Sequence, residues 1–522
     1  MSALISCREV AELMTSDRSF AVFDVRERGE YNECQIPGTT SLPRSQIEFR
    51  IQSLVPDRKI PLIVYDAEDG RAPLVAKTLN ELGYSEVSIL DGGLTAWRNE
   101  RRPTVGGVNV PSKAFGEKVH HERIIPDVTP EELNAMQQRR AELVILDVRT
   151  PEEYARFCIP NGINVPGGDL ILWVEQLKQK RDTAVVVNCA GRTRSIIGTA
   201  ALRRLGLTNV RALKNGTMGW VLAGLELETK PQRKTMTAPS VSRDKAAALA
   251  GQIALEEKLS WISAQQVSSV LQSMDDGVTY LIDVRSEDEF EAGHISGSIN
   301  VPGGQAVQRA DDFVAVRNAQ IVFISNESAR AVMAAYWYRQ MGFVNVFVLQ
   351  GGLRTWSEGG ETLVSGAIQN EPLSFEAAKR RARSIEARDL ERKLRDSATL
   401  VLDVGTSLEF ESAHVPGAKW ISRGWIELKF PQRFPDRTEP IVVTCPDGQQ
   451  SVFAARALVE IGYTDVAVMD GGVRAWAAEG FSTERGLEGC LVQPSDVVLS
   501  PSIRGSKKDM QRYLDWERAL QR

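Results

Sequence analysis

Four short apolar runs along the chain end in aspartate, and a second apolar run follows each at a fixed distance. The first runs lie at residues 22–24, 145–147, 281–283 and 401–403. The second run leads to a different residue in each copy, and a tryptophan follows 31 residues later, while the aspartate lies 42 residues earlier. Because both intervals are the same throughout, the pattern predicts four copies of one domain rather than a short structural repeat. The positions after the second run are Asp66, Cys189, Ser325 and Cys445, and the tryptophans are Trp97, Trp220, Trp356 and Trp476.

Within each copy the pattern alternates between strand and helix. In the second copy, residues 143–146 and 184–187 are continuous apolar runs, which are typical of strands buried on both faces. Residues 196–205 have helical spacing. Thr150 before Pro151 is typical of a helix start. The alternation predicts an α/β protein of four tandem domains, each a central, mostly parallel sheet flanked by helices.

The domains are separated where this pattern lapses. Residues 101–121 are rich in Pro and Gly without clear periodicity, and we interpret them as a linker. Residues 229–256 include an Ala-rich helix, and 365–384 form the third junction. Residues 508–520 predict an amphipathic helix that packs on a neighbouring domain through Met510, Tyr513, Leu514 and Trp516. The predicted domains are 1–104, 122–228, 257–364 and 385–485, with a C-terminal tail at 486–522.

Composition narrows the class of protein. The 522 residues are 43% hydrophobic and 25% charged, with a formal net charge of −5, which is typical of a globular protein and not of a nucleic-acid binder. No apolar stretch is long enough to span a bilayer, and the N-terminus lacks the features of a secretory signal. The six cysteines are scattered, so we expect a reduced, cytoplasmic protein without structural disulfides, metal or cofactor.

Between the second apolar run of copy two and the helix after it lies a cationic loop. Backbone N–H groups at a helix start lack intrahelical partners, and Gly191 lets the chain curl so that several of them converge. Arg192 and Arg194 add positive charge, so we expect a lowered pKa and a nucleophilic Cys189 that faces an anionic substrate. The alternative is an inert buried cysteine, which has no use for a cationic loop. The loop consists of Cys189, Ala190, Gly191, Arg192, Thr193, Arg194 and Ser195.

These motifs resemble those of the rhodanese-homology sulfurtransferases. The resemblance rests on DVRTPEEY from Asp147, on the loop CAGRTRS and on closing segments such as DGGLTAW, and it covers almost the whole chain. It implies a persulfide-carrying Cys189 that takes sulfur from thiosulfate, releases sulfite and passes the sulfur to cyanide or a thiol. Arg194 is the first candidate for anion binding and Arg192 the second, with Ala190, Gly191, Thr193 and Ser195 completing the site. The partners implied are small anionic donors and thiol acceptors, a protein acceptor included, with no nucleic acid or membrane.

Two other functions share this architecture. Tyrosine-phosphatase-like loops have the spacing C-x5-R, whereas Cys189 to Arg194 is C-x4-R, which suits a sulfur atom better than a phosphoryl group. A scaffold that binds sulfur anions or a sulfur-relay partner without turnover is the main alternative. Oligomeric state stays open.

The other loops have lost parts of this chemistry. Asp66 cannot carry a persulfide, and Ser325 has no identifiable base. Cys445 is a second candidate site, but Gln450 replaces the closing arginine, Asp447 adds negative charge and Pro446 removes an N–H group. We therefore expect no independent turnover there.

Several motif residues have structural interpretations. Arg149 lies beside Glu152 and Glu153, and we expect it to pair with an acid and brace the loop. Asp147 at its strand end is interpreted in the same way. Trp220 and Cys158 are interpreted as packed side chains.

Overall fold

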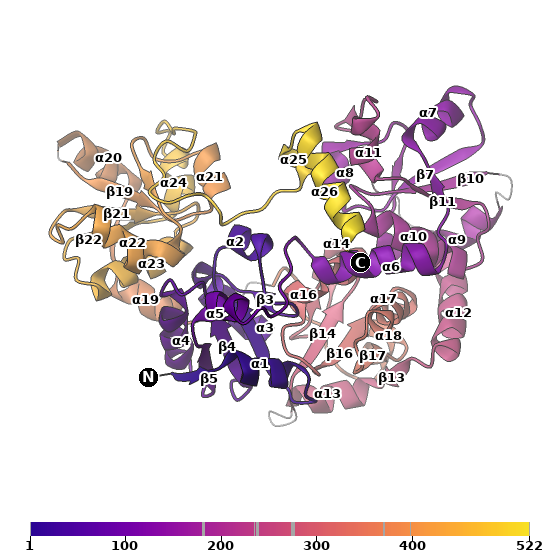
Figure 1. Cartoon of the computed structure of the whole chain (residues 1–522), viewed down its shortest axis with the longest axis horizontal. Helices are drawn as coiled ribbons and strands as arrows, with labels where there is room; N and C mark the ends of the chain where they lie inside the picture. Colours follow the sequence, from indigo (N-terminus) through magenta and orange to yellow (C-terminus); the bar gives the residue numbers. More distant parts are fainter. Residues whose placement is uncertain are drawn as a thin grey trace. The chain divides into compact units, whose positions relative to one another are not determined.

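The protein consists of two compact units, each of which combines two of the predicted domains (Figure 1). The computed structural model describes residues 2–179, 183–233, 235, 240–272, 277–368, 371–396 and 398–520. The first unit holds domains 1 and 4 and consists of Met1–Val108, Ala315–Arg317 and Gln369–Val498. The second unit holds domains 2 and 3 and the end of the chain, as Asn109–Val314, Asn318–Ile368 and Leu499–Arg522.

Each domain contains a five-stranded sheet whose strand pairings are all parallel, as predicted. The sheet of domain 2 has the order β6 (Asp127–Val128), β11 (Val210–Leu213), β10 (Ala184–Asn188), β7 (Leu143–Asp147) and β9 (Ile163–Asn164). A two-stranded antiparallel ribbon joins β8 (Phe157–Cys158) to β12 (Glu228–Thr229). The central strands β7 and β10 end side by side, with Asp147 opposite Asn188. The loop that starts at Cys189 therefore leaves the carboxyl edge of the sheet, where parallel α/β sheets place their binding sites.

The other three sheets repeat this order. Domain 1 has β1 (Ala3–Ile5), β5 (Val87–Leu90), β4 (Leu62–Tyr65), β2 (Ala21–Asp24) and β3 (Thr40–Ser41). Domain 3 has β13 (Ser260–Ile262), β17 (Val346–Leu349), β16 (Gln320–Ile324), β14 (Thr279–Asp283) and β15 (Ile299–Asn300). Domain 4 has β18 (Arg383–Ile385), β22 (Val466–Met469), β21 (Ile441–Thr444), β19 (Leu400–Asp403) and β20 (Lys419–Trp420).

The helices of domain 2 begin where local sequence signals predict. Thr150 caps α8, its hydroxyl accepts the N–H of Glu153, and Pro151 occupies the first turn. Trp220 is 2% exposed and packs against the core on one face of the sheet, as predicted. The helices are α7 (Pro130–Gln138), α8 (Pro151–Arg156), α9 (Leu170–Gln179), α10 (Thr193–Arg204) and α11 (Gly216–Leu222).

The same loop-to-helix step recurs in the other domains. The helices that follow the loops there are α4 (Arg71–Glu81), α17 (Ala329–Gln340) and α23 (Gln449–Glu460).

One predicted linker is wrong. Residues 101–121 contain α6 (Val110–Glu122), a 13-residue helix that packs on α10. Its helical pattern is hidden in the sequence because Lys113 and Glu117, both polar, are buried together with Val110, Phe115 and Val119. The helix forms through this tertiary contact rather than through a strong apolar stripe.

The predicted helices at the other junctions are confirmed as α12 (Ser240–Glu256) and α26 (Lys507–Ala519). Ser506 caps α26, and its Met510 and Leu514 pack against Met218 of α11. Figure 1 shows α26 beside α11 and α6 within the second unit. Among the described residues no helix is long and apolar enough to cross a membrane. A cytoplasmic location stays a prediction.

Candidate functional site

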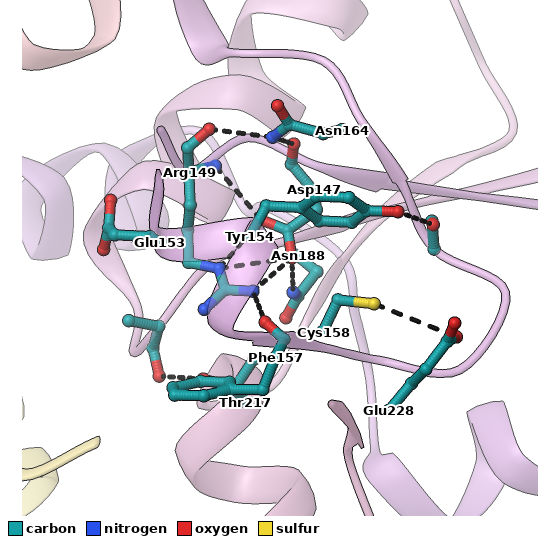
Figure 2. A network of polar contacts seen from close by, with 12 residues as sticks. Asp147, Arg149, Glu153, Tyr154, Phe157, Cys158, Asn164, Asn188, Thr217 and Glu228 are labelled. Atoms are coloured by element: carbon teal, nitrogen blue, oxygen red, sulfur yellow. Dashed lines mark hydrogen bonds and ion pairs between the residues drawn. The ribbon is translucent and has the colours of Figure 1, made fainter. Parts of the chain in front are cut away.

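A buried ion pair holds the strand ends beneath the loop. The Arg149 guanidinium donates to both carboxylate oxygens of Asp147, with Nε–Oδ1 2.9 Å and Nη2–Oδ2 2.7 Å, and also to the Phe157 carbonyl at 2.6 Å. Asn188 donates to the same carboxylate at 3.0 Å (Figure 2). The prediction that Arg149 pairs with an acid is confirmed, and the acid is Asp147 rather than Glu152 or Glu153. Both side chains are 1% exposed and are bound to each other, so they brace the strand ends beneath the loop.

Cys158, also drawn in Figure 2, is a packed side chain, as expected. It is fully buried, and its Sγ lies 4.0 Å from Glu228 Oε2 and 3.6 Å from Arg233 Nη2.

Cys189 lies directly between β10 and α10. Its Sγ is 3.5 Å from the Ser195 hydroxyl oxygen, and its side chain is 2% exposed. The carbonyls of Cys189 and Ala190 accept the N–H groups of Thr217 and Met218, at 2.9 and 3.1 Å. These two bonds fix the loop on the start of α11.

Both loop arginines are paired with glutamates. Arg194 makes two hydrogen bonds to Glu153, at 2.6 and 2.8 Å, and Arg192 makes two to Glu117 of α6, at 2.6 and 2.9 Å. Arg192 is 6% exposed and also donates to Asn215. The positive charge that the sequence shows in this loop is therefore largely neutralised by partners on α8 and α6.

The Arg194–Glu153 pair recurs in domains that lack the cysteine. Arg71 binds Glu30 in domain 1, and Arg330 binds Glu289 in domain 3, with the shorter bond 2.6 Å in each. This arginine thus tethers the helix start to the motif helix in three domains. Its charge still acts on Cys189, because Arg194 lowers the pKa of that thiol.

The C-terminal helix α26 covers the Cys189 loop. Glu517 Oε1 accepts the Thr193 hydroxyl at 2.6 Å, and the other carboxylate oxygen has no hydrogen-bond partner among the described residues. A Cβ atom added at Gly191 would lie 3.2 Å from that second oxygen and 3.0 Å from Met218 Cε. A side chain at position 191 would therefore press on Met218 and Glu517, so Gly191 leaves room for the close approach of α26, a role that the sequence does not suggest.

This cover changes the ionisation of the thiol. Burial is the largest influence and raises the pKa of Cys189, while Arg194 and the N–H and hydroxyl of Ser195 lower it and Glu517 raises it further. The expectation of a lowered pKa is wrong for this arrangement, because the sequence shows the arginines but not the helix that excludes water.

The other loops show where the N–H groups of this turn point. Asp66 accepts three of them, from Glu68, Gly70 and Ala72, at 2.8, 3.1 and 2.8 Å. The N–H six residues after the first loop position donates to the side chain of that position in domains 1 and 3, from Ala72 to Asp66 at 2.8 Å and from Ala331 to Ser325 at 3.3 Å. In domains 2 and 4 the equivalent N–H groups, of Ser195 and Ser451, lower the pKa of Cys189 and Cys445. The loop is thus built to hold an anionic atom at this position.

The Cys445 loop of domain 4 keeps the serine, as Ser451, but has Gln450 in place of the arginine. Its Sγ lies 3.6 Å from Ser451 Oγ and 3.7 Å from Asp447 Oδ1. Burial and the Asp447 charge both raise the pKa of Cys445. Gln450 donates to the Ser45 carbonyl of domain 1 at 3.0 Å instead of pairing with an acid.

A cavity of about 40 Å³ adjoins Arg194 and Thr193 on the side facing α17. It has room for one or two water molecules, and Cys189 does not line it. Among the described residues no cluster of His, Cys, Asp or Glu could hold a metal ion.

Three residues near the loop were not identified from the sequence: Glu117, Lys113 and Glu517. Two lie on the segment interpreted as a linker, and Glu517 is 324 residues away from Thr193 along the chain. The one available signal is the spacing of Phe115 and Val119, four residues apart as on one face of a helix.

Comparisons with known proteins agree with this architecture. The crystal structure of thiosulfate sulfurtransferase from Pseudomonas aeruginosa is 37% identical, with a TM-score of 0.92, and the match covers 99% of this chain and 97% of that one. Thiosulfate sulfurtransferase of Azotobacter vinelandii is 29% identical over 172 residues, 32% of this chain and 58% of that protein. Thiosulfate sulfurtransferase GlpE of Pseudoalteromonas translucida is 34% identical over 79 residues, 15% of this chain and 73% of that protein. Two further curated relatives are matched over only 59% and 49% of their lengths.

The model of the rhodanese-like domain matches four times, once around each loop. The matched residues are 6–100, 129–223, 266–359 and 386–479, which is well over half of the chain. Four parallel sheets of one strand order, each with the same loop at its carboxyl edge, are thus four rhodanese-like domains, and the chain belongs to the rhodanese family.

Proposed function

We propose that this protein is a thiosulfate sulfurtransferase in which Cys189 carries the transferred sulfur as a persulfide. The observation that supports this proposal best is that the N–H groups of the loop point at the side chain of its first residue. The turn that surrounds the Asp66 carboxylate in domain 1 surrounds a thiol in domain 2, with Arg194 nearby. A turn that accommodates a carboxylate suits a thiolate or persulfide anion at the same position. The likeness to thiosulfate sulfurtransferases supports the choice of donor.

The reaction has two balanced steps. The Cys189 thiolate attacks the outer sulfur of thiosulfate, a bond forms between Sγ and that sulfur, and sulfite leaves with the electron pair of the broken S–S bond. A thiolate or cyanide then attacks the outer sulfur of the persulfide, and Cys189 leaves as a thiolate. No electrons enter or leave, so the cycle is covalent, ping-pong catalysis.

The loop residues have separate roles in this cycle. The N–H groups of Gly191, Thr193 and Ser195, equivalent to the three that bind Asp66 in domain 1, stabilise negative charge on the sulfur. Arg194, oriented by Glu153, supplies the positive charge that lowers the pKa of Cys189. Arg192 is a positioning residue, since its Nε and Nη2 donate to Glu117 and its Nη1 donates to Asn215.

Mass spectrometry after thiosulfate treatment tests the proposal. We expect the Cys189 peptide to gain one sulfur atom in the wild type and in Cys445→Ser, and the Cys189→Ser variant to lose thiosulfate-dependent sulfur transfer. Equal sulfur transfer by Cys189→Ser would contradict the assignment and shift attention to Cys445.

One observation favours a second function. The cover of Cys189 by α26 suits a scaffold that binds sulfur anions or a sulfur-relay protein without turnover. The same experiment separates the two functions, because a scaffold binds thiosulfate without a gain of sulfur at Cys189.

A further inference from the structure

Lys113 of α6 lies near the Cys189 loop and has no carboxylate of the described residues at hydrogen-bond distance. Arg192 and Arg194 are each held by two hydrogen bonds to a glutamate. No carboxylate of the described residues forms an ion pair within 4.0 Å of the Lys113 ammonium group, although its side chain is only 3% exposed. A buried ammonium group without an ion-pair partner is unusual, because burying a charge is costly.

The surroundings of Lys113 come from α26. Its Nζ lies 4.5 Å from the ring centre of Tyr513 and 4.8 Å from that of Trp516, so two aromatic faces hold the charge. Three residues later, Gly116 packs directly on Thr193, which places this part of α6 against the loop. Glu517 lies on the same helix as the two rings. Its negative charge raises the pKa of both Lys113 and Cys189.

The Glu517 carboxylate has the properties of a displaceable anion. It is 2% exposed, and one oxygen accepts the Thr193 hydroxyl. The other oxygen faces Gly191 and has no hydrogen-bond partner in the part of the chain that the structure describes. A buried carboxylate oxygen left unpaired is costly. A sulfonate spreads its charge over three oxygens, so one can accept the Thr193 hydroxyl while another accepts from a nearby ammonium group.

We propose that Lys113, together with the Thr193 hydroxyl, binds the sulfonate end of the sulfur donor, and that the donor enters by displacing the Glu517 carboxylate from this position. The inference rests on the proposed function and adds a specificity-determining residue that lies outside the loop. With Glu517 displaced, Arg192 and Arg194 stay paired with Glu117 and Glu153, and Asp311 still acts on Lys113, so the incoming anion replaces the negative charge that Glu517 supplied. The donor class is a small molecule with a sulfonate group next to a transferable sulfur.

Alkylation of Cys189 by two reagents of different charge tests this subsite without any sulfur transfer. Iodoacetate is an anion and iodoacetamide is its neutral analogue, and the ratio of their rate constants at the Cys189 peptide reports the local preference for an anion. We expect Lys113→Met to lower this ratio roughly tenfold at pH 7, the size expected for one charge acting over a few ångströms in a partly buried site. Glu517→Gln should raise the ratio several-fold, because it removes the competing charge and keeps the shape.

The full-length protein supplies the controls. Lys118→Met changes an exposed lysine of the same helix and should leave the ratio within about twofold. The Cys445 peptide of each sample is an internal reference whose ratio should not move. A change in Lys113→Met that is equal for both reagents, or an effect of Lys118→Met as large as that of Lys113→Met, would overturn the proposal, as would a fall in the ratio in Glu517→Gln.

Steady-state kinetics provide the second readout. Lys113→Met should raise the KM for thiosulfate roughly tenfold while kcat changes less. If the alkylation ratio falls as expected but no sulfur reaches Cys189 in the wild type, the subsite stands and the proposed reaction fails. If sulfur transfer is normal and the ratio is unchanged, the reaction stands and the subsite fails.

Discussion

Asp403 of domain 4 is a buried carboxylate that has lost its arginine, and its replacement by asparagine should stabilise that domain. At the equivalent position of domains 1 to 3, the arginine two residues later makes two or more hydrogen bonds to the aspartate. Gly405 stands there in domain 4, and only its N–H binds Asp403, at 2.8 Å. Restoring the arginine is obstructed, because a Cβ atom at Gly405 would lie 2.7 Å from Pro446 Cδ. Asp403→Asn is therefore the cleaner change.

The magnitude follows from the pKa of Asp403. Burial raises it from 3.8 to about 7, and the side chain is 2% exposed. Each pKa unit corresponds to about 1.4 kcal/mol, so the ionised carboxylate destabilises the folded domain by about 4 kcal/mol above pH 7. The folded state binds the proton more tightly than the unfolded state. The penalty is therefore absent below about pH 4, grows as the pH rises to 7 and stays constant above it.

Hydrogen exchange of β19 and β21, measured by mass spectrometry at pH 5.5 and 8.5 with correction for intrinsic exchange, reports the stability of this domain alone. We expect Asp403→Asn to slow exchange, with an advantage over the wild type that is about 2 kcal/mol greater at the higher pH. The matched control is Asp283→Asn in domain 3, which breaks a pair with Arg285 and should lower local stability. An Asp403→Asn advantage that does not grow with pH would refute the reasoning.

Two further predictions concern the cover over Cys189. Leu514→Ala removes a fully buried side chain from the contact of α26 with Met218 and should weaken docking of α26 by about 2–5 kcal/mol. Iodoacetamide should then label Cys189 more than tenfold faster, whereas Gln511→Ala on the exposed face of α26 should not change the labelling rate. Equal labelling rates in the wild type and both variants would show that α26 does not limit access to Cys189. Burial lowers the pKa of Lys113 to about 8, with Glu517 and Asp311 opposing and Arg194 reinforcing this shift, so Lys113 is a cation below pH 8 and neutral above it. The KM for thiosulfate should then rise between pH 7 and 9.5 in the wild type and stay flat in Lys113→Met, and a flat wild-type profile would contradict the role of Lys113.

The sequence was sufficient for features that depend on neighbours along the chain. The strands, the Thr150 cap and the helix after Cys189 follow from local patterns. The placement of the loop at the carboxyl edge follows from strand order, which the alternation of strands and helices already implies. Even the tail helix was predicted, because its apolar residues recur at helical spacing.

The charge state of the loop was not predictable in this way. Arg192 and Arg194 are visible in the sequence, but Glu117 lies 75 residues before Arg192 and Glu153 lies 41 residues before Arg194. Glu517 is further still, and nothing in the spacing of α26 says which loop it covers. Counting only the charges within a loop therefore overstates the positive potential at its cysteine. Residues distant in the sequence determine both the net charge around the thiol and its exposure to water, and the thiol pKa depends on both.

The aspartate of domain 1 has a consequence for how many sulfur atoms one chain takes up. Its carboxylate already satisfies the three N–H groups that would otherwise attract a foreign anion. The first loop position of that domain is occupied by its own carboxylate, so under the proposed function domain 1 does not compete with Cys189 for thiosulfate. A fourfold repeat of the fold is therefore compatible with a stoichiometry of one.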